Sequence, residues 1–347
     1  MAEELRINGE LIPPGSNVTL ELPLPALYTQ TPMTMPVHVR RGRRAGPTLF
    51  VCAAVHGDEL NGVEIIRRLM RRRALSRIRG TLITVPIVNM YGVIGRSRYL
   101  PDRRDLNRSF PGSDRGSLAA RLADLFMTEI VHRCTHGIDL HTGGLHRTNL
   151  PQIRGHLDDA ETLRLARQFG VPVLINADLR DGSLREAAAA RGTPMLLYEA
   201  GEALRFDEIS IRAGVQGIVN VMRGLDMLAP SRGRKRSSAE PFVARSSSWV
   251  RAPASGIFRG TVTLGARVQQ DEKLGIVTEP IGDTESVVRA PFGGIVIGCS
   301  KLPMVLEGEA LFHVASFEDL HEVAEQVEEF QTSHEDAIEN GNPPSSL

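Results

Sequence analysis

Lysine is nearly absent from this sequence of 347 residues. Of the 41 basic residues only Lys235, Lys273 and Lys301 are lysines, and the rest are arginines. The first 234 residues therefore offer no Walker lysine, no Schiff-base lysine and no lysine general base. Reactions that depend on such a residue are excluded from the larger part of the chain.

Cysteine is also scarce, and the three cysteines, Cys52, Cys134 and Cys299, lie far apart. They form neither a CxxC pair nor a disulfide framework, so a reducing compartment is the simpler expectation. No apolar run reaches the roughly 18 residues of a membrane span. Residues 1–15 lack the apolar core of a signal peptide. We therefore expect a cytoplasmic protein with no membrane partner.

Net charge is absent as well, because 41 acidic residues balance the 41 basic ones. A protein held to nucleic acid by bulk charge is usually basic, so we expect no nucleic-acid partner. The apolar share of 41% and the charged share of 24% are typical of soluble globular chains with a sizeable core. The length suits one large domain with a small one, or two of medium size.

Apolar runs alternate with helical patterns between residue 47 and about residue 228. Strands are expected at residues 48–55, 81–89, 137–141, 171–177 and 195–200, and helices at 60–73, 118–130, 161–170, 183–192 and 206–228. This alternation predicts an α/β fold, in which a mostly parallel sheet carries helices on both faces. Ligands of such sheets bind beyond the carboxyl ends of the strands.

The character of the sequence changes at Pro230. Residues 230–248 are basic and serine-rich without an apolar period, which predicts a linker after the α/β domain of residues 1–229. Residues 249–316 are punctuated by glycine and rich in β-forming residues, which predicts a small all-β barrel or sandwich domain. The acidic tail, residues 317–347, is predicted to be helical or disordered.

Two groups of metal-binding side chains follow predicted strands. HGDE, residues 56–59, comes directly after the strand at 48–55, and DLHTG places His141 at the end of another strand. On a tight turn, His56 and Glu59 can both point at one metal ion. Two histidines and one glutamate are a known catalytic zinc set that leaves a position for water. Zinc lowers the pKa of that water to about 7, so it supplies hydroxide at neutral pH.

Two further clusters carry groups of use in catalysis. Residues 96–112, RSRYLPDRRDLNRSFPG, contain five arginines, whose guanidinium groups can bind carboxylates or stabilise an oxyanion. Glu199 ends the predicted strand MLLYEA and could shuttle a proton for metal-bound water. Each cluster also has a plain structural interpretation: His56 as a helix cap, His141 as a core histidine, the arginines as a solvated loop, and Glu199 as a surface or capping residue.

Together, the motifs HGDELNG, DLNRSFPG, DLHTG and YEAGE resemble those of the succinylglutamate desuccinylase/aspartoacylase family in the same order. That family is a branch of the zinc carboxypeptidase-like hydrolases, and the resemblance covers about residues 30–315. It implies a parallel-rich mixed sheet with helices on both faces and a C-terminal β domain. Residues 1–229 would then be a zinc hydrolase catalytic domain.

The resemblance also implies a cofactor and a base. One zinc ion would be held by His56, Glu59 and His141. Glu199 would act first as general base towards the attacking water and then as general acid towards the leaving amine.

The arginine-rich loop would supply the remaining groups. Arg98, in RYLP, resembles the arginine that polarises the scissile carbonyl, while Arg103 and Arg104 in the same loop compete for that role. Asn107 and Arg108, in DLNR, resemble the pair that grips a substrate carboxylate.

Residues 249–316 resemble a biotinyl/lipoyl-type barrel through APASG, GARVQQDEKLG and APFGG. A carrier of that type needs a lysine at the hairpin tip, where this sequence reads TEPIGDTES, so we expect no swinging-arm role. Two roles remain for this region, namely shaping or covering the active site and forming a contact in a homo-oligomer.

The function expected is therefore that of a zinc-dependent deacylase. Its substrate would be an N-acyl amino acid or a related small amide that bears a carboxylate, cleaved by metal-activated water. Two alternatives stay open: a metallocarboxypeptidase acting on peptides, and a non-catalytic member of the family that binds a metabolite. The sequence leaves open the acyl group, the amine and the physiological metal.

Overall fold

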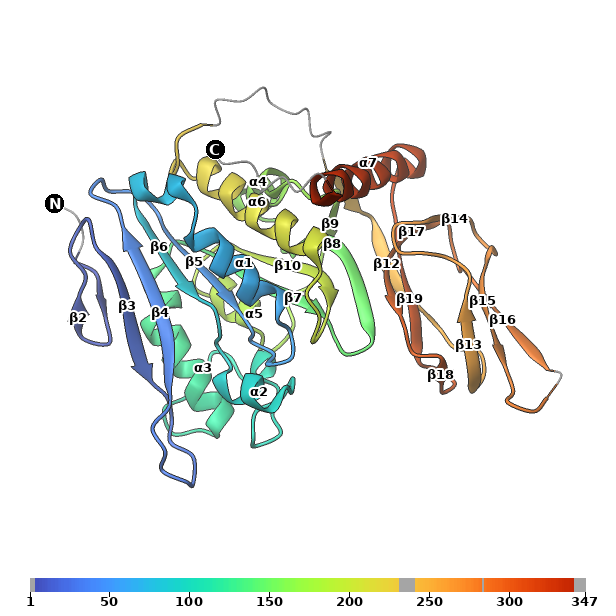
Figure 1. Ribbon diagram of the computed structural model, residues 1–347, viewed down its shortest axis with the longest axis horizontal. Helices are drawn as coiled ribbons and strands as arrows, with labels where there is room; N and C mark the ends of the chain where they lie inside the picture. The colour runs from blue at the N-terminus through green and yellow to red at the C-terminus, as the bar shows by residue number, and fades with distance from the viewer. Residues whose placement is uncertain (1–3, 231–240, 283, 340–347) are drawn as a thin grey trace.

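The computed structural model describes residues 4–230, 241–282 and 284–339. Figure 1 shows an α/β body, coloured blue to yellow, beside a β-rich region coloured orange and red. Residues 231–240, most of the expected linker, lie outside the described residues. Among the described helices, none has both the length and the apolar character needed to cross a membrane.

One large mixed sheet forms the centre of the α/β body. Four parallel strands lie side by side in the order β6 (Thr81–Val85), β5 (Thr48–Ala53), β7 (His136–Gly143) and β10 (Met195–Glu202). Strands β5, β6 and β7 are buried on both faces, as parallel strands under two layers of helices are. Antiparallel β4 (Thr34–Arg41) and β3 (Asn17–Pro23) extend the β6 side, next to a hairpin of β1 (Arg6–Ile7) and β2 (Glu10–Leu11).

Helices cover both faces of this sheet (Figure 1). On one face lie α1 (Asn61–Met70), α4 (Ala160–Phe169) and α6 (Glu208–Gly224), which share a core with the sheet through Leu69, Phe169 and Ile218. On the other face lie α2 (Met90–Gly95), α3 (Leu118–Glu129) and α5 (Leu184–Ala189), packed around Phe50 and Phe126. Short 3-10 turns occupy Arg73–Arg77, Leu106–Arg108 and Val131–Arg133. The predicted α/β fold is confirmed.

Strand β8 (Arg147–Gly155), which the sequence did not predict, joins the two parts of the molecule. One edge pairs with β10. The other edge pairs with β17 (Gly294–Ser300) through Arg147–Asn149 and with β9 (Val173–Asn176) through Gln152–Gly155. Pro151 lies between these two pairings, where the missing N–H costs no ladder hydrogen bond on that edge. β9 also pairs with β11 (Phe242–Ala244), so part of the expected linker is a strand.

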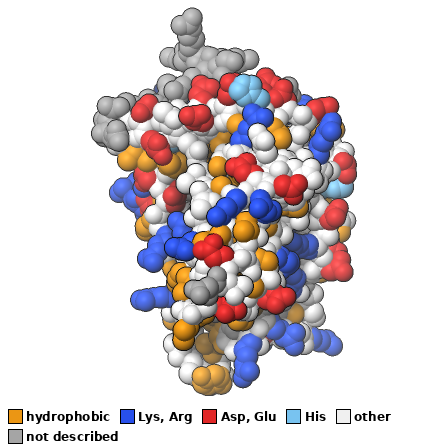
Figure 2. Space-filling view, turned by 90° about the vertical axis from the view of Figure 1, so that its right-hand side faces the viewer, with side chains coloured by type: hydrophobic (Ala, Val, Ile, Leu, Met, Phe, Trp, Pro, Cys, Tyr) orange, Lys and Arg blue, Asp and Glu red, His pale blue; other side chains and the backbone are white. Residues whose placement is uncertain are grey.

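The C-terminal region is all-β, as predicted, up to its last helix. Its strands β12 (Ser246–Arg251), β19 (Ala310–Ser316), β17 and β14 (Arg267–Val268) continue the large sheet. A second sheet contains, in spatial order, β16 (Glu285–Arg289), β15 (Lys273–Thr278), β13 (Gly256–Gly260) and β18 (Met304–Val305). Phe258, Leu274 and Phe312 fill the core of this region. On the face seen in Figure 2, acidic and basic side chains are interspersed.

The last helix, α7 (Leu320–Glu339), lies against both parts of the molecule. Val323 and Val327 are buried against the C-terminal strands, and Phe330 packs against the core beside α6. Together with the β8–β17 pairing, this contact fixes the C-terminal region beside the carboxyl ends of the central strands.

Candidate active site

The predicted metal-binding residues come from neighbouring strands of the large sheet. His56 and Glu59 lie in the turn that follows β5, and His141 lies near the carboxyl end of β7, the strand beside it. Glu199 lies on β10, the next strand along, where its Cα is the register partner of His141. Because these strands are parallel, their carboxyl ends meet at one edge of the sheet, where ligand sites of α/β proteins form.

Two close backbone approaches fix the turn that carries His56 and Glu59. A Cβ atom at Gly57 would lie 2.0 Å from the carbonyl carbon of Gly92, so only glycine fits there. A Cβ atom at Gly62 would lie 2.7 Å from the Cβ of Leu140, so α1 packs directly on β7. The turn is therefore held against both strand β7 and the start of α2.

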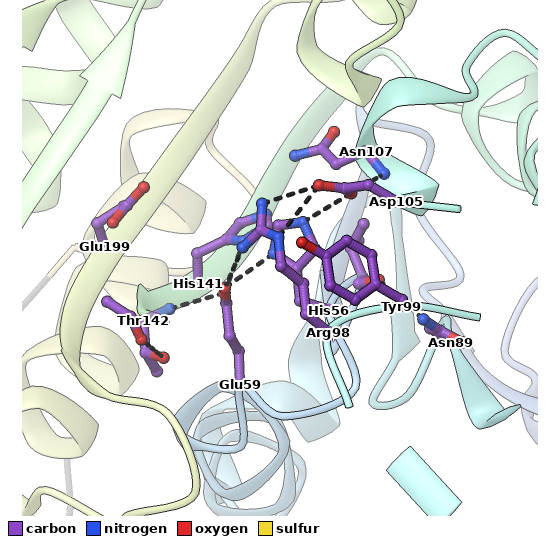
Figure 3. A network of polar contacts seen from close by, with 12 residues as sticks. His56, Glu59, Asn89, Arg98, Tyr99, Asp105, Asn107, His141, Thr142 and Glu199 are labelled. Carbon is purple, nitrogen blue, oxygen red and sulfur yellow. Dashed lines mark hydrogen bonds and ion pairs between the residues drawn. The ribbon is translucent and has the colours of Figure 1, made fainter. Parts of the chain in front are cut away.

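The Glu59 carboxylate lies between the two imidazoles (Figure 3). Its Oε1 is 2.8 Å from His56 Nδ1 and its Oε2 is 2.8 Å from His141 Nδ1. The backbone N–H of Thr142 also donates to Oε2, at 3.0 Å. One ligand atom from each of His56, Glu59 and His141 lies within 4.8 Å of the others, and all three residues are buried. The structure thus brings together the three residues predicted to bind metal.

A further carboxylate lies behind each histidine. Asp105 Oδ1 is 3.1 Å from His56 Nε2, and Asp139 Oδ2 is 2.7 Å from His141 Nε2. The Cys52 thiol donates to the other oxygen of Asp139, at 3.3 Å. Carboxylates that hold the far nitrogen of a metal-binding histidine fix its tautomer and raise its basicity. In both histidines this leaves Nδ1 as the atom that faces Glu59.

The protonation of the cluster agrees with a site built for a cation. Burial lowers the pKa of His56, but Glu59 and Asp105 outweigh burial and raise it. The pKa of His141 is raised well above its usual value, because Asp139 and Glu59 outweigh burial there too. Each imidazole meets a carboxylate at both ring nitrogens, which requires an N–H on each. The Glu59 carboxylate therefore favours positive charge at the two Nδ1 atoms that face it. Two imidazole nitrogens and one carboxylate also form a donor set that fits zinc.

Arg98 is the arginine of the 96–112 loop that reaches this cluster. Its Nε and Nη2 donate to Asp105 Oδ2 at 3.1 and 3.0 Å, and its Nη1 lies 3.3 Å from Glu59 Oε1. Burial lowers the pKa of Arg98, but Glu59 and Asp105 outweigh it and raise it. Arg103 and Arg104 are exposed and do not line the cleft.

Asn107 and Arg108 both line the cleft, but the side chain of Asn107 is buried and that of Arg108 is exposed. The Oδ1 of buried Asn107 accepts the backbone N–H of Leu184 at 2.9 Å, which holds the start of α5. Its Nδ2 group can still donate hydrogen bonds into the cleft. Arg108 is exposed and donates to the backbone oxygen of Asn107.

The cleft above the cluster has a volume of about 790 Å³ and is rich in arginine. Its arginines are Arg98, Arg108, Arg147, Arg154, Arg180 and Arg185. Burial and the charges of Arg154 and Arg180 lower the pKa of Arg185 to about 10. The C-terminal region completes the wall with Ser246, Ser247, Trp249 and His313. Burial and Arg154 lower the pKa of His313 to about 3, so this side chain is neutral near pH 7.

Glu199 lies beyond His141 and Thr142 in Figure 3, and no contact drawn there reaches it. Its carboxylate instead accepts a hydrogen bond from Asn149 of β8. No sequence motif predicted a role for Asn149, Asp105 or Asp139. Asp139 could have been found, because it lies two residues before His141 on one strand and so shares its face. Asp105 and Asn149 meet the site only through tertiary contacts.

Comparison with known proteins places these residues in a family context. The family model of the succinylglutamate desuccinylase/aspartoacylase catalytic domain matches residues 45–225, a range that contains every predicted site residue. The N-alpha-acetyl-L-2,4-diaminobutyric acid deacetylase of Halomonas elongata is 30% identical over 248 residues. These residues make up 68% of this chain and 71% of that protein.

Solved structures extend the similarity to the C-terminal region. The succinylglutamate desuccinylase/aspartoacylase of Rhodobacter sphaeroides has a TM-score of 0.77 at 26% identity, and the match covers 87% of this chain and 95% of that one. The product-bound ectoine utilization protein EutE (DoeB) of Ruegeria pomeroyi has a TM-score of 0.79 at 23% identity, covering 91% and 100%. Both matches include most of the chain, so the fold as a whole is shared.

Proposed function

Because the chain belongs to the succinylglutamate desuccinylase/aspartoacylase family, we propose that it is a zinc-dependent deacylase of small N-acyl amino acids. The observation that carries the proposal is the buried His56, Glu59 and His141 cluster, with Glu199 in register beside His141. These positions support a metal-binding donor set on one side of the cleft and, on the neighbouring strand, a carboxylate that moves protons.

In this proposal one zinc ion is held by His56, Glu59 and His141. When bound, zinc lowers the pKa of a water ligand to about 7 and polarises the scissile carbonyl. Glu199 takes a proton from the attacking water and returns it to the nitrogen of the leaving amine, as a general base and then a general acid. Asp105 and Asp139 keep both imidazoles oriented throughout.

Arg98 acts on the scissile carbonyl. Its guanidinium is held in place by Asp105 before any substrate arrives, so it can donate to the carbonyl oxygen without reorganising. Asn107, through Nδ2, and Arg108, through its guanidinium, bind a substrate carboxylate. Their places on the cleft wall, beside the 3-10 turn of residues 106–108, support this role.

The character of the cleft supports a small anionic substrate. A volume of about 790 Å³ lies in the range of small-molecule sites, roughly 300–1,000 Å³. Six arginines face three acidic side chains in its wall, which favours a ligand with a carboxylate. The relative from Halomonas elongata is named for an N-acetyl amino acid, so N-acetyl amino acids are the first substrates to test.

We further propose that the chain works in the cytoplasm, that its catalytic domain ends near residue 229, and that its C-terminal β region shapes the cleft. The contribution of Trp249 and His313 to the cleft wall supports the last point. Contact between copies in a homo-oligomer remains a second role for the same region.

The experiment that tests the function is a hydrolysis screen. Purified, zinc-loaded protein is given N-acetyl, N-succinyl and N-formyl amino acids and, in parallel, short peptides, and release of free amine is measured. Hydrolysis of an N-acyl amino acid supports the deacylase. Cleavage confined to peptides would point to a metallocarboxypeptidase. Protein that holds no zinc, and gains no activity when zinc is added, would point to a metabolite-binding member.

A further inference from the structure

The carboxylate of Glu199 is held from the side of β8. Asn149 Nδ2 donates a hydrogen bond to Glu199 Oε2, and Arg154 Nε lies 3.8 Å from Glu199 Oε1. Both partners belong to the same strand. The orientation of this carboxylate is therefore set by β8 and not by the metal-binding residues.

Asn149 is buried and sits at the junction between the two parts of the molecule. It is 5% exposed. Its Cα pairs with Gly201 of β10 on one side and with Gly298 of β17 on the other. The amide that contacts Glu199 thus comes from the strand on which the C-terminal region is hydrogen-bonded to the α/β body.

Gly298 leaves room for this amide. A Cβ atom there would lie 2.9 Å from Asn149 Oδ1 and 3.2 Å from the Cβ of His313. His313 pairs with Gly298 in register, and its ring stacks on Trp249 with centroids 4.7 Å apart and planes at 11°. With His313 packed in this way, it has little freedom to move aside, so a side chain at Gly298 would press on Asn149.

We propose that Asn149 is a positioning residue for Glu199, and that the C-terminal β region fixes its place through Gly298. This inference rests on the proposed function for the role of Glu199 as a base. Asn149 donates one N–H to Oε2 and so limits rotation of the carboxylate. The C-terminal β region then contributes to catalysis indirectly, because its strand β17 sets where the Asn149 amide lies.

Two substitutions at Asn149 separate positioning from packing. Asn149→Ala removes the donor, and we expect kcat to fall on the order of 10²-fold with KM near the wild-type value, as for a misplaced catalytic group. Asn149→Leu keeps the approximate size of the side chain but has no N–H donor and adds no charge beside Glu199. Positioning predicts that Leu lowers kcat as far as Ala does, whereas a packing role predicts that Leu restores most of the activity lost in Ala.

Gly298→Ala tests the link to the C-terminal region. The added methyl group presses on the Asn149 amide, so we expect kcat to fall in the same direction as in Asn149→Ala while zinc content stays at the wild-type level. Asn17→Ala, at an exposed position of strand β3, is the matched control for Asn149→Ala and keeps wild-type kcat. Thermal unfolding of each variant shows whether it is folded at the assay temperature.

Crystal structures of wild type and Asn149→Ala give a readout that needs no turnover. We expect the Glu199 carboxylate to rotate away from its wild-type position in the variant. An unmoved carboxylate, or a variant with wild-type kcat beside an active wild type, would overturn the inference. Wild-type protein that hydrolyses no substrate would instead count against the proposed function, and the two failures are thereby distinct.

Discussion

Glu199 and His141 are register partners across the parallel pair of β10 and β7. Side chains of register partners in neighbouring strands share one face of a sheet. A proposed base and a proposed metal ligand are therefore placed together by the hydrogen-bond ladder itself. This arrangement gives Glu199 access to the cleft without making it a ligand of the cluster.

Replacing Glu199 by glutamine should separate proton transfer from metal binding. We expect kcat to fall about 10²- to 10⁴-fold, because a positioned general base contributes that much. Zinc content should stay at one ion per chain, since the Glu199 carboxylate contacts Asn149 and Arg154 and not the side chains of the three cluster residues. Glu318→Gln, an exposed side chain paired with Arg245, is the matched control. Full turnover in Glu199→Gln would remove this residue from the mechanism.

Arg98 should be the arginine on which turnover depends. We expect Arg98→Ala to lower kcat/KM on the order of 10²- to 10³-fold, the usual effect of losing one donor to a developing oxyanion. Arg103→Ala should have the activity of wild type, because Arg103 is exposed and outside the cleft wall. Steady-state kinetics of the two variants decide the matter. A loss in Arg103→Ala with none in Arg98→Ala would reverse the assignment.

The carboxylates behind the histidines should tune zinc affinity. Asp105→Asn and Asp139→Asn each remove the negative charge that orients an imidazole, so we expect zinc affinity to fall about 10- to 100-fold. Competition with a chromophoric chelator measures this change. Asp319→Asn, near the start of α7, serves as control. Affinities equal to wild type in both site variants would show that the imidazoles need no such support.

Gly62 should be critical for stability. A methyl group there would lie 2.6 Å from the Cβ of Ala53 and 2.7 Å from the Cβ of Leu140, both in the sheet. Gly62→Ala should therefore lower the free energy of unfolding by about 1–3 kcal/mol, as overpacking does. Gly95→Ala, whose methyl group would meet only the Cβ of Ser97 at 3.9 Å, should leave it nearly unchanged. Urea unfolding measures the stability of both variants. Equal unfolding midpoints for Gly62→Ala and Gly95→Ala would show that a methyl group at Gly62 causes no overpacking.

The sequence predicted the centre of the fold because local patterns determine it. Apolar runs such as residues 48–55 and 195–200 became β5 and β10, and the helical periods between strands became α1, α3, α4 and α6. Strand β8 was missed because TNLPQIRG is polar and contains Pro151. Its place depends on pairing with β10 and β17, which are distant in sequence.

In the candidate site, too, local patterns predicted some residues, while others depend on contacts between distant parts of the sequence. His56, Glu59, His141 and Glu199 were found because each follows or ends a recognisable strand. The contacts of Asp105 and Asn149 were not foreseen, since they depend on how a loop and an unpredicted strand fold back on the sheet. Motifs at strand ends therefore predict which groups meet, while the residues that orient them emerge only from tertiary structure.

One measurement tests the metal centre directly: an anomalous difference map, collected at the zinc edge, from crystals of the zinc-loaded protein. The proposed zinc site predicts a single strong peak, about 2.0–2.2 Å from His56 Nδ1, His141 Nδ1 and a Glu59 carboxylate oxygen. A peak at other residues, or no peak between these three, would contradict it.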